Sequence, residues 1–279
     1  MADRVMAEAQ AMAEAPFRSV ADIGIRVPKS LPLPIDPELQ AMVAKLAGIT
    51  RGAGIVMAAQ EVAADPTPAG KLRTVLALLK LLVFGRMQQT VDEVVREAPK
   101  LGCGAGCAYC CYHSVEATIP EAILVAAQLA DPADARRRKV LDTADRLRGV
   151  SESERRRRGI PCPLLVDNHC SVYEDRPPMC RAMLAADAGQ CRASHVSALA
   201  GKGDTPIEHF PAAQYFALGD QAGMRGILKD MGLQHDLVEL TQAVAAILRD
   251  PGIIDRWLAG ERVFGPDQTL AEQAAAVPA

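Results

Sequence analysis

Hydrophobic side chains recur at helical spacing in several stretches of this chain. The clearest pattern extends over residues 69–97, where leucine and valine return every three to four positions, and Pro99 follows it. Further helical patterns are expected at 38–46, 123–129, 134–158 and from 206 to about 258, with breaks at Gly232 and Asp250-Pro251-Gly252. The pattern therefore predicts a mostly helical protein.

Prolines and capping residues set the boundaries between these stretches. Four prolines from Pro28 to Pro37 exclude a helix and predict an extended strap. Thr118 and Glu121 stand at capping-box spacing ahead of an apolar run. We therefore expect the following division: an N-terminal extension and strap (1–37), a single helical domain (38–260) with a cysteine-cluster core (102–191), and a C-terminal tail (261–279).

Composition narrows the fold class. Nearly half of the 279 residues are hydrophobic but only ten are aromatic, which favours helices packed through small side chains over a β-sandwich. Residues 161–191 are rich in proline and lack periodicity, so irregular structure is expected there. The predicted fold is mostly α, with helices packed around an irregular cysteine-rich metal-binding centre and a short strand pair near 114–117 and 171–173.

Charge and hydropathy limit the classes of partner. The net charge of −3 gives no basic footprint for nucleic acid. Two basic runs, at 136–139 and 155–158, are expected on a solvated helix face rather than in a polyanion site. No stretch approaches the ~20 consecutive apolar residues that span a bilayer, so no membrane partner is expected.

The redox compartment follows from the N-terminus and the cysteines. The first residues mix charges into apolar positions and lack the continuous core of a secretory signal, so a cytoplasmic location is expected. In a reducing compartment, eight clustered cysteines indicate metal binding rather than disulfides. A metal ion or cluster is the expected partner, and docking to another protein is a further role that the centre could serve.

The first cysteine cluster places four thiols within nine residues, beside three glycines. Glycine allows positive φ, so the loop can curl until several sulfurs converge, and its free amide groups can donate to thiolates. Adjacent Cys110 and Cys111 project in different directions. One of them is expected to share a metal with Cys103 and Cys107, and the other is a candidate ligand for a second ion or a packing thiol.

The second cluster contains Cys162, Cys170 and Cys180. The proline after Cys162 stiffens the chain beside a thiol, as prolines do beside iron–sulfur ligands. Arg176 and Arg181 could offset the negative charge of several thiolates, and a salt bridge to a neighbouring acidic residue is an equal alternative.

Histidines could add ligands to a zinc site. His113 and His169 lie beside cysteines, but local hydrogen bonding is the commoner role for such residues. His195, His209 and His235 are scattered along the chain and are expected at helix surfaces or caps rather than in a site.

The order of the motifs resembles the YkgJ-type cysteine-cluster family, a zinc- or iron-chelating domain. Cys-x3-Cys-x2-Cys-Cys is followed by Cys-Pro-Leu and then by Cys-Ser-Val-Tyr-Glu-Asp-Arg-Pro-Pro-Met-Cys-Arg, over roughly residues 102–191. The resemblance implies that the metal-site cysteines are Cys103, Cys107, Cys110, Cys111, Cys162, Cys170 and Cys180. Cys191 lies outside the matched pattern, and its role is open between a ligand and a small buried side chain.

The resemblance implies either an iron–sulfur cluster or zinc as the cofactor. A relative in that family, flagellin lysine N-methylase, is a methyltransferase described as carrying a four-iron cluster. Glycine-rich backbone and the Cys-Pro pair favour a [4Fe–4S]-like centre slightly over closed tetrahedral zinc sites. The expected function is metal binding, with an electron-transfer, metal-handling or docking role.

Enzyme activity is the alternative. The relative implies a protein lysine N-methyltransferase as the leading enzyme hypothesis. Cys103, Cys107 and Cys110 also have the spacing of the radical S-adenosylmethionine loop, but a long helix rather than a strand precedes them. No nucleophile elbow, phosphate loop or acid–base constellation is recognised, so no catalytic residue is predicted.

Overall fold

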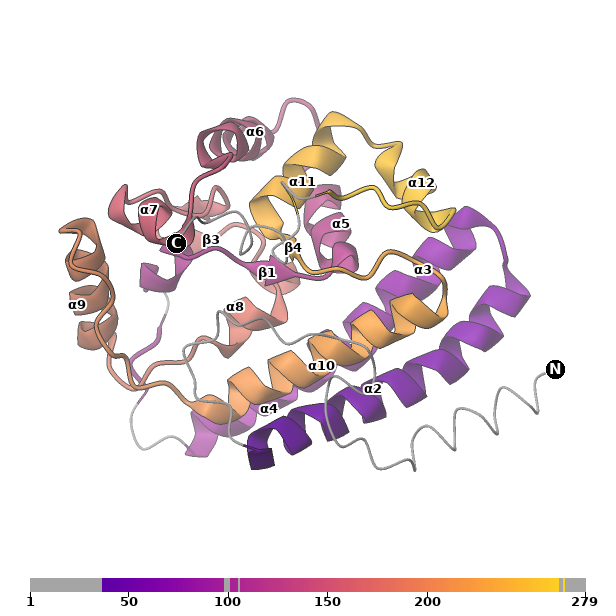
Figure 1. Ribbon diagram of the computed structural model, residues 1–279, viewed down its shortest axis with the longest axis horizontal. Helices are drawn as coiled ribbons and strands as arrows, with labels where there is room; N and C mark the ends of the chain where they lie inside the picture. The colour runs from indigo at the N-terminus through magenta and orange to yellow at the C-terminus, as the bar shows by residue number, and fades with distance from the viewer. Residues whose placement is uncertain (1–36, 98–100, 105, 266–267, 269–279) are drawn as a thin grey trace.

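The computed structural model describes residues 37–97, 101–104, 106–265 and 268, and Figure 1 shows their arrangement. These residues are mostly helical, as the sequence predicts. Residues 1–36 of the predicted extension and strap (1–37) lie outside the described residues, as do residues 266–267 and 269–279 of the predicted tail (261–279).

One side of the molecule is built from long helices. These are α2 (Pro37–Ala64), α3 (Pro68–Leu78), α4 (Arg86–Glu97) and α10 (Pro211–Asp230), and α2, α4 and α10 lie side by side in Figure 1. The long pattern predicted at 69–97 is present as α3, the π-helical segment η2 (Leu79–Gly85) and α4 in direct succession. After this widened turn, the Arg86 guanidinium reaches Thr50 Oγ1 at 2.6 Å and the buried Asp220 carboxylate at 3.3 Å.

The α2 and α10 backbones pack unusually closely because glycines line the contact. A Cβ built on Gly223 of α10 would lie 2.5 Å from Thr50 Cβ and 2.8 Å from the Ala47 carbonyl oxygen of α2. Gly219 is equally constrained, at 2.5 Å from Leu46 Cβ. The pair therefore depends on the absence of side chains at these positions.

Replacing Gly223 by alanine should separate α2 from α10. The added methyl group meets backbone and Cβ atoms that cannot turn away, so we expect the free energy of unfolding to fall by about 1–3 kcal/mol. Urea denaturation measures this change. Gly85→Ala is the matched control, because a Cβ there lies at an ordinary 3.6 Å from Lys80 O. An unchanged midpoint for Gly223→Ala would contradict the close packing.

Helix α2 also bears on the membrane question. Its segment Ala41–Ala64 is long and apolar enough to cross a membrane, judged by length and composition alone, and half of that segment is buried inside the fold. The sequence-based expectation considered only uninterrupted runs of apolar residues. The mean hydropathy of the helix remains high even though it includes the charged residues Lys45 and Arg51. Helix α2 packs mainly against α10, and it also contacts α3.

The main hydrophobic core lies between α3, the C-terminal half of α10 and four further helices. These are α5 (Ile119–Ala127), α6 (Ala135–Leu147), α11 (Leu240–Arg249) and α12 (Ile253–Leu258). Trp257 of α12 is fully buried and donates through Nε1 to the Gln234 carbonyl at 2.9 Å. Cys162 and Cys170 pack on the edge of this core, so the cysteine-rich segment is anchored to it.

The predicted strand pair is wrong in its partners. Strand β1 (Glu116–Ala117) pairs with β4 (Val238–Glu239), antiparallel, with Glu116 opposite Glu239. Strand β2 (Leu165–Val166) instead pairs with β3 (His169–Cys170), and residues 171–173 belong to no strand. Short strands carry little periodicity, so their partners depend on how the surrounding helices pack.

The start of α5 confirms the predicted capping box. Glu121 accepts a hydrogen bond from the Thr118 N–H at 2.6 Å. Its carboxyl group has no exposed surface, and burial raises its pKa from 4.5 to about 8 against the opposing effect of the Thr118 hydrogen bonds. The cap therefore makes stability depend on pH.

Because the pKa of Glu121 is raised on folding, its contribution to stability is complete below pH 4.5 and decreases up to about pH 8. Glu121→Gln keeps an acceptor for Thr118 but cannot ionise. Relative to the parent protein, the variant should therefore gain stability between pH 5 and pH 8, by several kcal/mol at most. Urea denaturation at pH 5 and pH 8 gives the free energy of unfolding of both proteins. The difference between variant and parent at each pH removes the effects of other titrating groups, which are common to both. A constant difference would contradict the prediction.

Candidate metal centre

The first cysteine cluster forms a loop that leads into a short helix. Cys103 and Cys107 lie in the loop after α4, and Cys110 and Cys111 lie in the 3₁₀ helix η3 (Tyr109–Tyr112). Of the three glycines, Gly106 adopts positive φ (84°). Gly102 is required for a different reason, since a Cβ there would lie 2.4 Å from the Ala188 nitrogen.

The second cluster and Cys191 are spread over several separate segments. Cys162 precedes β2, Cys170 ends β3, Cys180 lies in α8 (Pro178–Ala182), and Cys191 lies in α9 (Ala188–Leu199). The 3₁₀ helix η4 (Tyr173–Asp175) connects β3 to α8. All eight cysteines are half-buried free thiols.

The two clusters meet in space. The Cys162 N–H donates to the Cys111 carbonyl at 2.7 Å, which joins segments about fifty residues apart. The pKa of Cys111 is raised mainly by its hydrogen bond to Cys110 and by burial. Electrostatic repulsion from Cys110, Cys162 and Cys180 raises it further. The glycine-flanked and proline-rich segments therefore converge.

Backbone amides are directed at several of the sulfurs. Cys103 Sγ accepts from the Ala185 N–H at 3.1 Å. Burial raises the pKa of Cys162 to about 11, and the Leu164 N–H opposes this rise. Burial likewise raises the pKa of Cys170, opposed by the N–H two residues further on. Such donors stabilise a thiolate, as ligand sulfurs in metal centres require.

The adjacent thiols Cys110 and Cys111 are electrostatically different. A hydrogen bond from Cys111 lowers the pKa of Cys110 to about 7 despite its burial, and His113 and Arg176 add to the effect. The same hydrogen bond raises the pKa of Cys111. Cys110 is therefore more readily ionised than its neighbour Cys111.

Two arginines have separate roles here. The Arg181 guanidinium is buried and donates to the Arg176 carbonyl at 3.1 Å, to Gln88 Oε1 at 2.9 Å and to the Glu174 carbonyl. It thus fastens η4 and α8 to α4. Arg176 lies over the Tyr173 ring at 3.6 Å, and its charge lowers the pKa of Cys110, Cys170 and Cys180.

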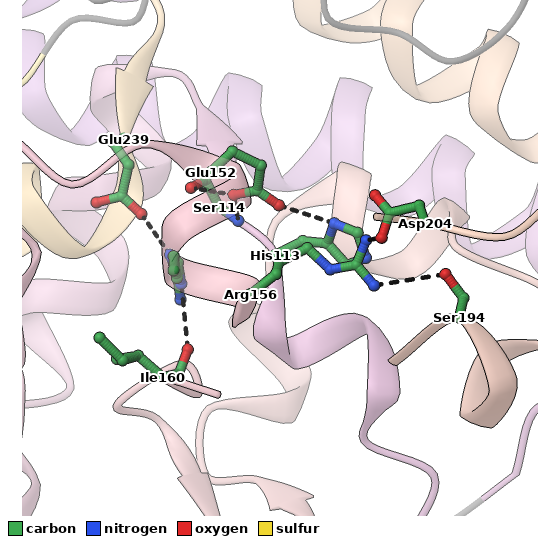
Figure 2. A network of polar contacts seen from close by, with 9 residues as sticks. His113, Ser114, Glu152, Arg156, Ile160, Ser194, Asp204 and Glu239 are labelled. Carbon is green, nitrogen blue, oxygen red and sulfur yellow. Dashed lines mark hydrogen bonds and ion pairs between the residues drawn. The ribbon is translucent and has the colours of Figure 1, made fainter. Parts of the chain in front are cut away.

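Helix α7 (Glu152–Arg157) holds the chain that leaves the first cluster (Figure 2). Glu152 accepts from His113 Nδ1 at 2.9 Å and from the Ser114 N–H and hydroxyl at 2.8 and 2.6 Å. Burial would raise the pKa of Glu152, but these hydrogen bonds outweigh it and lower the pKa to about 2. The carboxylate is therefore charged at neutral pH and fixes the loop.

The basic run 155–158 differs from the expected solvated face. Arg155 and Arg156 are 2% and 3% exposed. Arg155 donates to the Ile160 carbonyl at 3.3 Å and to Glu239 at 3.2 Å, and Arg156 contacts Ser194 of α9 and Asp204 (Figure 2). Only the second half of the run, which pairs with Glu154, is exposed. The buried half connects α7 to β4 and α9.

The surroundings of the thiols contain unsatisfied polar atoms. Among the described residues, Ser171 Oγ, Arg176 Nε, His195 Nδ1 and His209 Nδ1 are buried without a hydrogen-bond partner. In the part of the chain that the structure describes, no three cysteine, histidine, aspartate or glutamate side chains stand in the arrangement of a metal site. The chemistry of the side chains suits a thiophilic metal, because the cysteines are free thiols and the Arg176 guanidinium lies near Cys110.

Sequence reasoning left the role of Cys191 open and expected two histidines that lie near the cysteines, His195 and His209, outside any site. Cys191 lies close enough for the charges of Cys103, Cys107 and Cys110 to raise its pKa. The His195 ring lies 4.2 Å from that of Tyr112, and His209 shares a β-bridge with Ala185, next to the Cys103 contact. The spacing of four residues between Cys191 and His195, which puts both on one helix face, was the available signal. His113 and His169 make local hydrogen bonds, to Glu152 and to the Asp167 carbonyl.

Comparison with known proteins identifies the cysteine-rich segment. Residues 102–198 match the family model CxxCxxCC, described as "Putative zinc- or iron-chelating domain". This match confirms the resemblance recognised from the motifs. No curated protein and no solved structure matches the chain.

The Arg181 contacts predict a sensitive position. Arg181→Lys replaces the guanidinium, which donates to two backbone carbonyls and to the Gln88 side-chain oxygen, with a single ammonium group. Some of these buried acceptors then lose their hydrogen-bond donor. We expect a loss of about 1–3 kcal/mol in the free energy of unfolding, measured by urea denaturation. Arg157→Lys is the matched control on an exposed pair, where about 0–1 kcal/mol is expected. Equal effects of the two substitutions would contradict the structural role of Arg181.

Proposed function

Since residues 102–198 form a CxxCxxCC domain, we propose that this protein binds a metal centre through cysteine thiolates. An iron–sulfur centre is favoured over zinc. The centre stabilises the fold and serves electron transfer, metal handling or docking of a protein partner in the cytoplasm, where thiols stay reduced. The ligands come from Cys103, Cys107, Cys110, Cys111, Cys162, Cys170 and Cys180.

The convergence of thiols from distant segments is the observation that carries this proposal. Half-buried thiols raise one another's pKa, because two neighbouring thiolates repel each other. A cation placed among them reverses this effect, since each thiolate then gains an opposite charge. Without such an ion, ionised thiols this close to one another repel, and the electrostatic energy of the cluster is unfavourable.

The surroundings of the sulfurs favour iron–sulfur over zinc. The stability and potential of a cluster depend on hydrogen bonds to its sulfurs and on nearby charge. The N–H groups of Ala185, Leu164 and Val172 and the Arg176 guanidinium supply both. Zinc is the alternative, because a closed tetrahedral site uses the same thiolates.

A methyltransferase would need a cofactor pocket beside the centre. A cavity of about 310 Å³ lies between α6 and the segment Ile160–Pro161 that leads to Cys162. The charged side chains of Arg138, Lys139, Asp142 and Arg146 share its lining with Ala135, Thr143, Ile160 and Pro161. The methyltransferase alternative therefore rests on the resemblance to flagellin lysine N-methylase and not on this cavity.

Metal analysis of anaerobically purified protein tests the proposal. An iron–sulfur centre should make the protein brown, with broad absorbance near ~400 nm from charge transfer between thiolate and iron. Elemental analysis of the same sample gives the iron and zinc content per chain. Colourless protein with stoichiometric zinc would overturn the iron assignment, and protein without either metal would overturn the proposed function.

A further inference from the structure

Helix α6 lies along the segment that carries the second cysteine cluster. Arg136, in its first turn, donates to the Ser171 carbonyl at 3.2 Å. Lys139, about one turn further on, donates to the Leu165 carbonyl at 2.6 Å. The cavity of about 310 Å³ lies between this helix and the segment Ile160–Pro161, which directly precedes the first thiol of the cluster. A ligand in this cavity is therefore next to the cysteine-rich segment.

The helix concentrates positive charge on the side that faces the cavity. Its sequence contains five basic and two acidic residues, a net charge of +3 in a chain whose net charge is −3. Arg138, Asp142 and Arg146 follow one another at intervals of four residues, so they lie on one face. All three are exposed, and all three line the cavity. This face of α6 is therefore both accessible and cationic.

The two guanidinium groups on this face have no partner within the chain. Arg136, on the same helix, pairs with Asp134. Arg138 and Arg146 form neither an ion pair nor a hydrogen bond with any described residue, although Asp142 lies one turn from each of them. An unpaired guanidinium offers a planar fork of donors that fits a carboxylate or a phosphate. The face therefore has two binding positions for anionic groups.

The spacing of these positions favours an extended acidic peptide over a single small anion. Eight residues of α-helix separate the Cα atoms of Arg138 and Arg146 by about 12 Å. An extended chain advances about 3.3 Å per residue, so two acidic side chains four positions apart span a similar distance. Asp142, between the arginines, repels a lone anion placed midway, whereas it can accept from a backbone N–H of a peptide.

The rest of the lining favours a protein over a nucleic acid. Proteins that bind single strands combine a basic groove with aromatic rings on which the bases stack. Ala135, Thr143, Ile160 and Pro161 complete the lining, so the described residues around this cavity include no aromatic side chain. Arginine is, in contrast, enriched where proteins contact one another.

We propose that this face of α6 docks an extended acidic segment of a partner protein, with carboxylates paired to Arg138 and Arg146. The bound segment crosses the cavity beside Ile160–Pro161 and brings the partner next to the second cysteine cluster. This inference rests on the proposed function, whose docking role it makes specific. Attraction between the cationic face and an acidic partner speeds association and weakens as salt is added.

Fluorescence anisotropy of a labelled peptide of about ten glutamates tests the proposal on the full, anaerobically purified chain. Binding should weaken several-fold when the salt concentration rises from about 50 to about 300 mM. The double variant Arg138→Gln/Arg146→Gln should bind about tenfold more weakly, because both ion pairs are lost. Arg96→Gln/Arg192→Gln is the matched control, since it removes two exposed charges outside α6 and should bind like the parent.

The outcomes separate the docking surface from the metal centre. Metal content, measured on the same samples, should be equal in the parent and the double variant because neither arginine is a ligand. No binding by the parent, or equal binding by the parent and the double variant, would overturn the docking surface. Inorganic phosphate that displaced the peptide at equal concentration, or an oligouridylate that bound more tightly, would overturn the acidic protein as partner. A parent that bound the peptide as expected but held no metal would overturn the proposed function alone.

Discussion

The contact between the Cys111 carbonyl and the Cys162 N–H connects the two halves of the cysteine region. It brings together thiols that lie far apart in the chain and that raise one another's pKa. Such a cluster is unfavourable when ionised and unpaired, and becomes favourable when a cation is shared. The surrounding scaffold can therefore be understood as a frame that holds sulfur atoms near one another.

The frame is built mainly from charged and backbone contacts. Helix α7 fixes the loop after the first cluster through Glu152, and its buried arginines reach β4 and α9. Arg181 connects the second cluster to α4, which belongs to the long-helix layer. In the irregular segments, arginine guanidinium groups that each donate to several acceptors stabilise the structure alongside apolar contacts. Within the long-helix layer, α2 packs closely against α10 through glycines.

The location of Cys191 changes the description of the site. The motif describes seven cysteines, and the eighth approaches them only because Gly102 and the two tyrosines lie against α9. The same arrangement brings His195 next to the loop, although the spacing of histidines along the chain suggested no site. Both residues lie within the matched segment 102–198, and the packing of α9 brings them beside the first cysteine loop.

The sequence by itself determined the helices and the cysteine motif of the chelating domain. Periodicity over 69–97, the Thr118–Glu121 cap and the cysteine motif all depend on residues close in the chain, so they are visible without a structure. Tertiary structure alone decided the partner of β1, the burial of Arg155 and the approach of Cys191 to the loop. Each of these joins segments separated by tens of residues, and such contacts depend on the path of loops and on core packing rather than on local preference.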